Sequence, residues 1–476
     1  MSRRREPLAV ATAAAAFAAG YAVLAVLRHR SFGTGRFDLG NMTQAVWSTA
    51  HGRPLEATTL AGEQFVRLGT HFDPLLALVA PMWLVWPDPE LLLVLQAVGL
   101  ALGALPVFLL ARKHLRSERA AVLVAVAYLL SPVLGWTALA DFHAVALATP
   151  LLLGAWWFLD EERLVPFALC AVLTVATKEH VGLVVAGMGI WHAISRRRRV
   201  PGFPIAAAGV AISVLAAAVV IPYYSPSGSS DFYGRYEGIG GSPGEIARTA
   251  LTDPLRMARE AGEGRDGAYL LRLAAPVAGL CLLAPTALIP AVPELALNLL
   301  SDTRTQTSIR HHYSAATLVA LVVAAILGAA RLARRGVPPA ALRGVAVGAA
   351  LVASYLLGPL PVWRALPGGE GLPAATFRVT AHDRYADGAV RLIPDDAVVS
   401  ASNSLGAHLS ERRRIYSFPR LLDATWVAVD ESSPGYLDRF APRDYARAIA
   451  RLRRDPRWRL VLERDGVLVF RRRGPR

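Results

Sequence analysis

The sequence predicts an all-α polytopic membrane bundle followed by a small α/β soluble domain. Hydrophobic residues make up 54% of the 476 residues and charged residues only 18%, whereas an average soluble chain carries about 25% charged residues. Mean hydropathy is +0.38. Apolar runs recur up to residue 361, and the composition becomes mixed from about residue 376. These three observations exclude a disordered chain and argue against an ordinary soluble enzyme.

About eleven apolar runs are candidate transmembrane helices, because a bilayer core about 30 Å thick needs roughly 20 apolar residues in a helix. Several runs are short, so we expect the helices that meet near Lys178 and near Pro285 to be broken or tilted. The run 75–86 is too short to span, and its terminal Trp86 favours a helix at the membrane surface. The expected spans are 7–27, 91–110, 119–139, 144–159, 164–177, 181–195, 203–222, 270–284, 285–300, 314–333 and 341–361.

Clusters of basic residues set the expected orientation of this bundle. They lie at 3–5, 112–119, 196–199 and 331–343. Eleven spans with a cytoplasmic N-terminus place all four clusters in the cytoplasm, where membrane proteins collect arginine and lysine. The net charge of +15 therefore indicates topology, and no nucleic-acid partner is expected. No clear cleavage site follows 7–27, so we expect an uncleaved first span and an extracytoplasmic C-terminus.

The change in composition near the C-terminus predicts a separate domain. We assign 1–361 to the transmembrane domain with a long outer loop at 28–90, 362–375 to a linker, and 376–476 to an extracytoplasmic α/β domain. An Asp-Gly pair at 465–466 is a hairpin signal. The tail has no glycine-rich phosphate loop and no catalytic triad, which favours a docking or lid domain. We expect helices at 383–392 and 442–454 and strands at 397–402, 414–418, 425–430, 458–463 and 467–472.

Polar residues gather in the segments that this orientation places outside. Asp38 follows the first span, and it either caps a helix running to Ala50 or acts as a base or metal ligand at the membrane surface. His71 and Asp73 are two residues apart, so in an extended segment both can face one site. Asp73 before Pro74 is equally an ordinary helix start. Both interpretations stay open for each carboxylate.

Two further clusters lie in tight turns at the outer ends of spans. Asp141 and His143 flank a phenylalanine in one turn, which repeats the acid–imidazole combination. Lys178 stands beside Glu179 in the other turn and is one of only two lysines in the chain. In a chain that otherwise uses arginine, this lysine indicates a chemical role, although an interfacial snorkelling pair is the alternative.

The remaining candidates lie between about 294 and 313. Arg310 and the adjacent His311 begin an outer span end together with Tyr313, and an arginine with a histidine could hold a phosphate. Glu294 lies inside an apolar run, one turn before Asn298, and acids within a membrane are costly and often functional. Because acids, histidines and a lysine from distant segments meet one membrane face, we expect one shared site.

At these residues the chain resembles the domain of unknown function 2079 family of predicted bacterial membrane proteins. The matching segments cover about 31–333, and a further match, VVSASNSLGAHLSERRRIYSFP, lies in the tail. That family is similar to the GT-C superfamily of integral-membrane glycosyltransferases, which place an acid and then surface helices in the first outer loop. Asp38 matches the position of that acid, and 71–86 resembles the surface helix. The matching segments are FDLGNMTQAVWSTAHGRPL, HFDPLLALVAP, LLLVLQAVGLALGALPVFLLAR, DFHAVALATPLLL, TKEHVGL and HHYSA.

The resemblance implies a GT-C-like fold and sugar transfer from a polyprenyl-phosphate donor to an extracytoplasmic glycan, lipid or protein acceptor at the cell membrane. Such a reaction needs a carboxylate that takes the acceptor proton and cations that hold the lipid phosphate. The expected catalytic residues are Asp38, Asp141 and Glu179. The expected substrate-binding residues are His71, Asp73, His143, Lys178, Glu294, Arg310, His311 and Tyr313.

Three alternatives remain open at the level of the sequence. A divalent cation could be held by Asp38, His71 and Asp73. The protein could instead be a transporter or lipid flippase, although transporters usually keep ionisable groups near the bilayer midplane and these spans hold almost none. It could also be a non-catalytic membrane protein that binds a polymer or partner through its tail.

Overall fold

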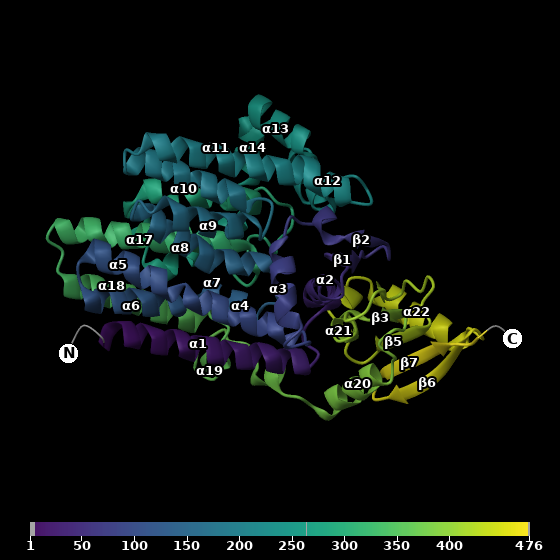
Figure 1. Ribbon diagram of the computed structural model, residues 1–476. Helices are drawn as coiled ribbons and strands as arrows, with labels where there is room; N and C mark the ends of the chain where they lie inside the picture. The colour runs from purple at the N-terminus through teal and green to yellow at the C-terminus, as the bar shows by residue number, and fades with distance from the viewer. Residues whose placement is uncertain (1–4, 263, 475–476) are drawn as a thin grey trace.

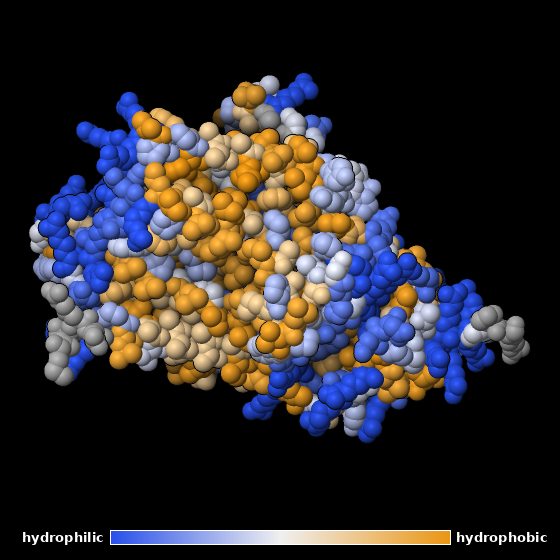
Figure 2. All heavy atoms as spheres, in the orientation of Figure 1, coloured by the Kyte–Doolittle hydropathy of each residue, from blue (hydrophilic) through white to orange (hydrophobic). Residues whose placement is uncertain are grey.

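The computed structural model describes residues 5–262 and 264–474. It is mostly helical, with a bundle of long helices at one end and a small sheet at the other (Figure 1). The N-terminus lies at the end of the bundle far from the sheet (Figure 1). A broad apolar belt covers the visible face of the bundle between two polar ends (Figure 2). This arrangement is that of a membrane bundle with a polar domain beyond it.

Five helical segments among the described residues are long and apolar enough to cross a membrane, and a sixth is counted if the α6–α7 pair, bent by 46°, forms one span. Helices α8, α9 and α10 are apolar but shorter. These lengths support a polytopic bundle and do not establish the expected count of about eleven. The bundle helices are α1 (Arg5–Arg30), α4 (Glu90–Leu102), α5 (Ala104–Leu115), α6 (Glu118–Leu129), α7 (Pro132–Leu139), α8 (Ala148–Asp160), α9 (Leu164–Val175), α10 (Val181–Ser195), α11 (Arg199–Leu215), α12 (Ile221–Tyr224), α17 (Ala315–Arg334) and α18 (Pro339–Leu357).

Helix α17 is the central helix of the bundle. In its most apolar window 78% of the residues are buried inside the protein, against 22% for α1. It packs against α5, α8 and the 3-10 turns between residues 280 and 291. A helix that is apolar on all sides and enclosed by other helices is typical of a bundle core. The N-terminal end of α17 therefore has a fixed position, which becomes important at the site.

The expected spans 270–284 and 285–300 are wrong as continuous helices. The segment instead consists of two short helices joined by 3-10 turns. Four prolines remove backbone donors there, and Ala278 and Gly279 both adopt positive φ, 51° and 66°. Irregular backbone is tolerated at membrane depth where protein surrounds it, and this segment lies against α10 and α17. The helices that flank this broken segment and precede it are α13 (Pro243–Thr252), α14 (Pro254–Glu260), α15 (Gly264–Ala274) and α16 (Val292–Leu299).

The first outer segment folds back across the end of the bundle. A π-helical turn, η2 (Arg36–Gly40), leads directly into α2 (Asn41–Ala50). A two-stranded antiparallel ribbon follows, β1 (Glu56–Thr58) with β2 (Gln64–Val66). Helix α3 (Leu75–Trp83) then occupies the position of the expected surface helix at 75–86. No side chain caps α2, because η2 continues straight into it, so Asp38 is not the helix cap that one interpretation proposed.

The C-terminal residues form a five-stranded mixed sheet in the order β4-β3-β5-β7-β6. Strand β3 pairs in parallel with β4 and β5, and β7 pairs antiparallel with β5 and β6. Separate apolar clusters cover its two faces, one packed under α20 and one under α22. The elements are α20 (Ala381–Arg391), β3 (Val399–Ala401), α21 (Asn403–Ala407), β4 (Ile415–Ser417), β5 (Trp426–Asp430), α22 (Pro442–Arg454), β6 (Trp458–Arg464) and β7 (Val467–Arg472).

Candidate functional site

Two adjoining cavities open where the bundle meets the outer segments. The larger has a volume of about 230 Å³ and the smaller about 60 Å³. We refer to both together as the outer cavity. Its walls come from the loop before α3, the 178–180 turn between α9 and α10, the 3-10 segment η6 (Asp231–Ile239) and the start of α17. The residues that line both parts are His71, Lys178, Phe232, Arg235, His312 and Tyr313.

Asp38 faces the smaller part of the outer cavity from the π-helical turn. Its Oδ1 lies 3.2 Å from Nε2 of His143, and 41% of its side chain is exposed. Nδ1 of His143 lies 2.8 Å from the carbonyl oxygen of Asp141. Both ring nitrogens therefore face oxygen atoms that accept, so Asp38 and His143 hold a proton between them. The second carboxylate oxygen of Asp38 has no protein partner among the described residues.

The charges around Asp38 keep its carboxylate ionised. Partial burial opposes ionisation, but His143, His311 and Arg67 outweigh it and lower the pKa of Asp38 below its usual value. The ring of His143 stacks on His312 with centroids 3.5 Å apart. Asp38 is thus an ionised, half-exposed carboxylate beside an imidazole, which is the form a general base requires.

Asp73 is buried in an ion pair and does not face solvent. Its Oδ2 accepts a hydrogen bond of 2.8 Å from Nε of Arg67, and both side chains are at most 3% exposed. Burial raises the pKa of Asp73 to about 6, although Arg67 opposes the shift. Its side chain does not cap α3, since no side-chain cap bond is present there. Arg67 has no signal in the sequence, because nothing marks a lone arginine before a short turn as buried.

His71 and Glu179 join the first outer segment to the 178–180 turn. Nδ1 of His71 lies 3.0 Å from Oε1 of Glu179, and the backbone N–H of Phe72 donates to Oε2 at 3.1 Å. Burial lowers the pKa of His71 to about 4, so the imidazole is neutral near pH 7. Burial opposes ionisation of Glu179, but His71 and Lys178 lower the pKa of Glu179 below its usual value. Both oxygens of this carboxylate are occupied.

Lys178 and Arg235 bring uncompensated positive charge into the outer cavity. The ammonium of Lys178 lies 5.8 Å from the centre of the Tyr313 ring. The guanidinium of Arg235 lies 4.4 Å from the Phe232 ring, and its Nη1 donates to Tyr313 Oη at 3.4 Å. Neither cation forms an ion pair within 4.0 Å among the described residues. Burial lowers the pKa of Lys178 from its usual value, and Glu179 opposes this shift.

Glu294 lies at the base of the cavity and closes the first turn of α17. Its carboxylate accepts from the backbone N–H of Thr317 at 2.5 Å and of Ala316 at 3.4 Å. Nε2 of His180 lies 3.5 Å from Oε1. A carboxylate at a helix N-terminus is stabilised by the free N–H groups and the helix dipole. This contact explains how a glutamate is accommodated inside an apolar segment.

Two of the expected site residues are directed elsewhere. Asp141 accepts from Nη1 of Arg28 at 2.8 Å and from the N–H of Gly35 at 2.8 Å, so it ties the end of α1 to the outer segment. Arg310 pairs with Glu370 at 2.7 Å on the exposed surface. His311 is exposed beside Tyr313. The other expected residues meet at the outer cavity, and Arg235, from a loop whose tyrosines alone were prominent in the sequence, joins them.

The proposed metal ligands do not converge on one point. Asp73 bonds to Arg67 and His71 bonds to Glu179, which leaves Asp38 without either as a partner. Across residues 5–262 and 264–474, no group of three or more His, Cys, Asp or Glu side chains is placed to hold a metal ion. The expected set of Asp38, His71 and Asp73 therefore does not fit a divalent cation in this arrangement.

Comparisons with known proteins agree with this arrangement of helices. A family model described as "Predicted membrane protein (DUF2079)" matches residues 28–469. The crystal structure of ArnT from Cupriavidus metallidurans bound to undecaprenyl phosphate aligns with a TM-score of 0.53 and 13% identity, covering 99% of this chain and 98% of that one. The apo oligosaccharyltransferase of Archaeoglobus fulgidus aligns with a TM-score of 0.48 and 14% identity, covering 90% and 70%. No curated protein matches the sequence. The ArnT alignment shows a fold of the GT-C type.

Proposed function

The chain belongs to the DUF2079 family of predicted membrane proteins, and we propose that it is an integral-membrane glycosyltransferase of GT-C type. The proposed reaction moves a sugar from a polyprenyl-phosphate donor to an acceptor on the extracytoplasmic side. The observation that carries the proposal is the outer cavity, where Lys178 and Arg235 lack carboxylate partners and stand near the half-exposed Asp38. A site with free cations and a free carboxylate suits an anionic leaving group and a nucleophile that loses a proton.

The donor phosphate is placed between Lys178 and Arg235 in this proposal. Arginine and lysine bind phosphate strongly through charge-assisted hydrogen bonds, and they bind more strongly where water is partly excluded. The cavity wall on the membrane side includes Val145, Leu183 and Ile221, which suit the first isoprenyl units of a lipid. The ArnT structure holds undecaprenyl phosphate, and we infer a lipid phosphate of the same class here.

The reaction follows from this placement. The acceptor hydroxyl oxygen forms a bond to the anomeric carbon of the sugar, and the bond from that carbon to the phosphate oxygen breaks. The electron pair leaves with the lipid phosphate, whose charge Lys178 and Arg235 stabilise. Asp38 takes the acceptor proton, and His143 holds the carboxylate in the orientation seen at 3.2 Å.

Asp38 is preferred to the other two candidate bases on the grounds of its contacts. Both oxygens of Asp141 and both oxygens of Glu179 accept hydrogen bonds from neighbouring groups. A carboxylate in that state cannot take a new proton without breaking a structural contact. Asp38 has one oxygen open to the cavity.

We also infer that the C-terminal domain is extracytoplasmic and the N-terminus cytoplasmic, as the four basic clusters indicate. A reporter that is active only in the cytoplasm, fused to the C-terminus, is expected to stay inactive. An active reporter would reverse the orientation and move the outer cavity to the cytoplasmic face.

The enzymatic proposal is tested by sugar transfer from synthetic polyprenyl-phosphate sugars to acceptors in inverted and right-side-out vesicles. General-base catalysis typically contributes 10²- to 10⁴-fold, so Asp38→Asn is expected to lower the rate by roughly that factor at equal expression. Arg256→Gln, on the exposed surface of α14, is the matched control and should retain the wild-type rate. Equal rates in wild type and Asp38→Asn would remove Asp38 from the mechanism. Binding of the lipid without any transfer would favour a transporter or binding protein.

A further inference from the structure

The turn that carries Asp38 is held by the C-terminal domain. The backbone N–H of Phe37 donates to Oδ1 of Asn403 at 3.1 Å, across 366 positions of sequence. Helix α21, which begins at Asn403, packs directly on η2. A π-helical turn is a rare structure that is found mostly at functional sites. Contacts from a distant domain therefore fix the conformation of the residues on each side of Asp38.

Arg36, two residues before Asp38, ties this turn to the sheet. Its Nη1 donates to Oγ of Ser417 at 2.7 Å. Its Nη2 donates to the carbonyl oxygens of Ile415 at 2.8 Å and Thr58 at 3.0 Å. Arg36 is only 3% exposed, and its fork of donors connects η2, β1 and β4 at once. A shorter or more flexible cation could not reach all three acceptors.

The two backbones approach each other too closely for any side chain between them. A Cβ atom on Gly35 would lie 2.4 Å from Nδ2 of Asn403, and one on Gly40 would lie 2.5 Å from Oγ of Ser410. On the other side, a Cβ on Gly406 would lie 2.9 Å from Cβ of Arg36. Glycines at both ends of the turn and in α21 thus permit a tight contact that a loosely docked lid would not need.

Asn403 is itself held rigidly by the C-terminal domain. Its backbone N–H donates to Oδ2 of Asp438 at 2.9 Å, and the N–H of Gly435 donates to the same oxygen at 2.9 Å. Asp438 is buried. Asn403 also follows β3 directly, at the carboxyl end of a strand in the centre of the sheet. The acceptor that Phe37 uses is therefore fixed by the sheet rather than by the turn.

We propose that the C-terminal domain completes the active site, with Asn403 and Arg36 acting as positioning residues that hold the Asp38 carboxylate against His143. This inference rests on the proposed function only for its effect on rate; the clamp itself is a statement about structure. Without the contact from Asn403, the turn can relax toward an ordinary helical start, and Asp38 leaves the orientation in which it meets both His143 and the acceptor.

The test compares Asn403→Ala, Asn403→Asp and His382→Ala in the full-length protein. Asn403→Ala removes the acceptor, and Asn403→Asp restores an acceptor oxygen of the same shape. His382 bonds Asp430 and Asp465 at 2.8 Å and 3.1 Å on α20, so His382→Ala disturbs the same domain without touching the turn. The two readouts are hydrogen–deuterium exchange of residues 35–42 and the separate values of kcat and KM for the donor.

In Asn403→Ala we expect exchange of residues 35–42 to speed up about tenfold and kcat to fall roughly 10- to 100-fold with the donor KM unchanged. Asn403→Asp should recover most of both, and His382→Ala should change neither. Unchanged exchange in Asn403→Ala would overturn the clamp. An equal loss of kcat in His382→Ala would reduce the effect to general destabilisation and overturn the positioning role. If wild type transfers no sugar, the proposed function fails, while the exchange result still decides whether the clamp exists.

Discussion

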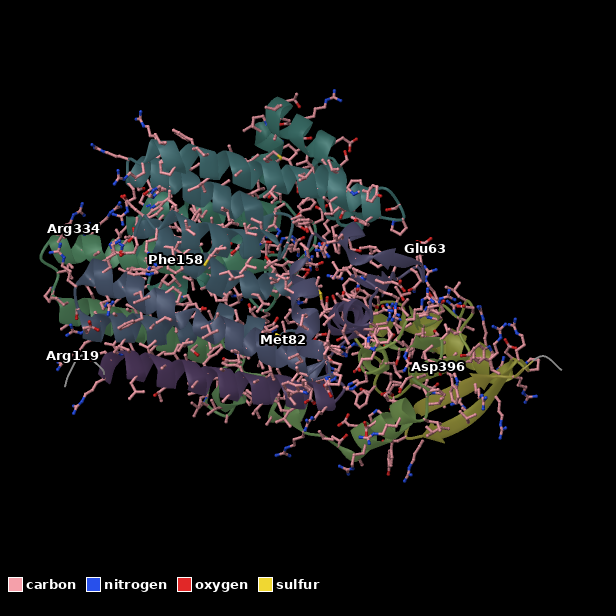
Figure 3. The ribbon with its side chains drawn as sticks, in the orientation of Figure 1. Glu63, Met82, Arg119, Phe158, Arg334 and Asp396 are labelled. Atoms are coloured by element: carbon pink, nitrogen blue, oxygen red, sulfur yellow. The ribbon has the colours of Figure 1, made fainter. Side chains whose placement is uncertain are left out.

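The only two lysines of the chain lie at opposite ends of the bundle and have opposite surroundings. Lys113, at the arginine-rich end marked by Arg119 and Arg334 in Figure 3, contacts Asp160 at 2.8 Å and Glu161 at 2.6 Å. Lys178, at the cavity end, has an aromatic ring for a neighbour and no ion pair within 4.0 Å in the described part of the chain. The same side chain is used for structure at one end, while at the other its charge remains available to a ligand.

The carboxylates of the two ends differ in the same way. Asp160 is 1% exposed and contacts Lys113, His114 at 2.9 Å, and Arg196. Asp38 is 41% exposed and contacts a single imidazole. A buried, saturated charge stabilises a fold only as long as every partner remains. A half-exposed charge with one free oxygen contributes little to the fold and remains able to react.

The largest expected effect is on stability at the arginine-rich end. Asp160→Asn leaves buried cations without their carboxylate, which typically costs about 3–5 kcal/mol, so its thermal unfolding midpoint in detergent should fall well below wild type. Asp38→Asn loses one partly exposed contact, worth less than about 1 kcal/mol, and should unfold close to wild type. If Asp38→Asn proved the less stable of the two, the distinction between a structural and a functional end would be wrong.

The second effect is on binding of a lipid phosphate. Lys178→Met and Arg235→Gln should each weaken binding of undecaprenyl phosphate roughly 10- to 100-fold, because a hydrogen bond to a charged group contributes about 1.5–3 kcal/mol. Lys113→Met should bind the lipid as wild type does, although it is less stable. Native mass spectrometry with undecaprenyl phosphate and with undecaprenol measures both arms. Equal loss of both lipids would mean that the cavity holds the tail and not the phosphate.

The smallest effect concerns the pH dependence of stability at the cavity end. The pKa of Asp73 is raised to about 6 in the folded protein, chiefly by burial. A carboxyl whose folded pKa is raised stabilises the protein at low pH, and this contribution is lost as pH rises from about 4 to about 6. His71, whose pKa is lowered to about 4, contributes in the opposite sense over the same interval.

Subtracting one variant from wild type separates these two opposing groups. Asp73→Asn should approach wild-type stability near pH 4.5, where Asp73 is protonated, and diverge from it between pH 5 and 7. Unfolding midpoints of both proteins in detergent, measured from pH 4.5 to 7.5, give the difference. A difference that does not change with pH would show that Asp73 titrates outside this interval.

Much of the fold followed from local patterns in the sequence. The five C-terminal strands and both helices lie within a few residues of their expected ranges, because alternating and amphipathic patterns are local signals. The Asp-Gly pair forms the expected turn, with both residues at positive φ. The apolar segment 270–300 was mispredicted, since hydropathy records burial but not whether prolines break the helix. For the same reason the number of spans could not be derived from apolar runs alone.

The candidate site was predictable in its membership but not in its contacts. The sequence indicated that His71, Glu179 and Lys178 share one end of the bundle, and the structure brings them together. It could not indicate that Asp141 would be consumed by Arg28, because that contact spans 113 positions. Arg235 was one arginine among many in a tyrosine-rich loop. Pairing between distant residues decides which charges stay free, and no local pattern records it.

The central claim is that Lys178 and Arg235 hold a lipid phosphate within reach of Asp38. A cryo-electron microscopy map of the protein in nanodiscs with undecaprenyl phosphate tests this claim most directly. The account predicts phosphate density in contact with the Lys178 ammonium and the Arg235 guanidinium, on the side of the outer cavity that opens to Asp38. Density for the phosphate beside Arg310 and Glu370, or at the arginine-rich end near Lys113, would contradict it.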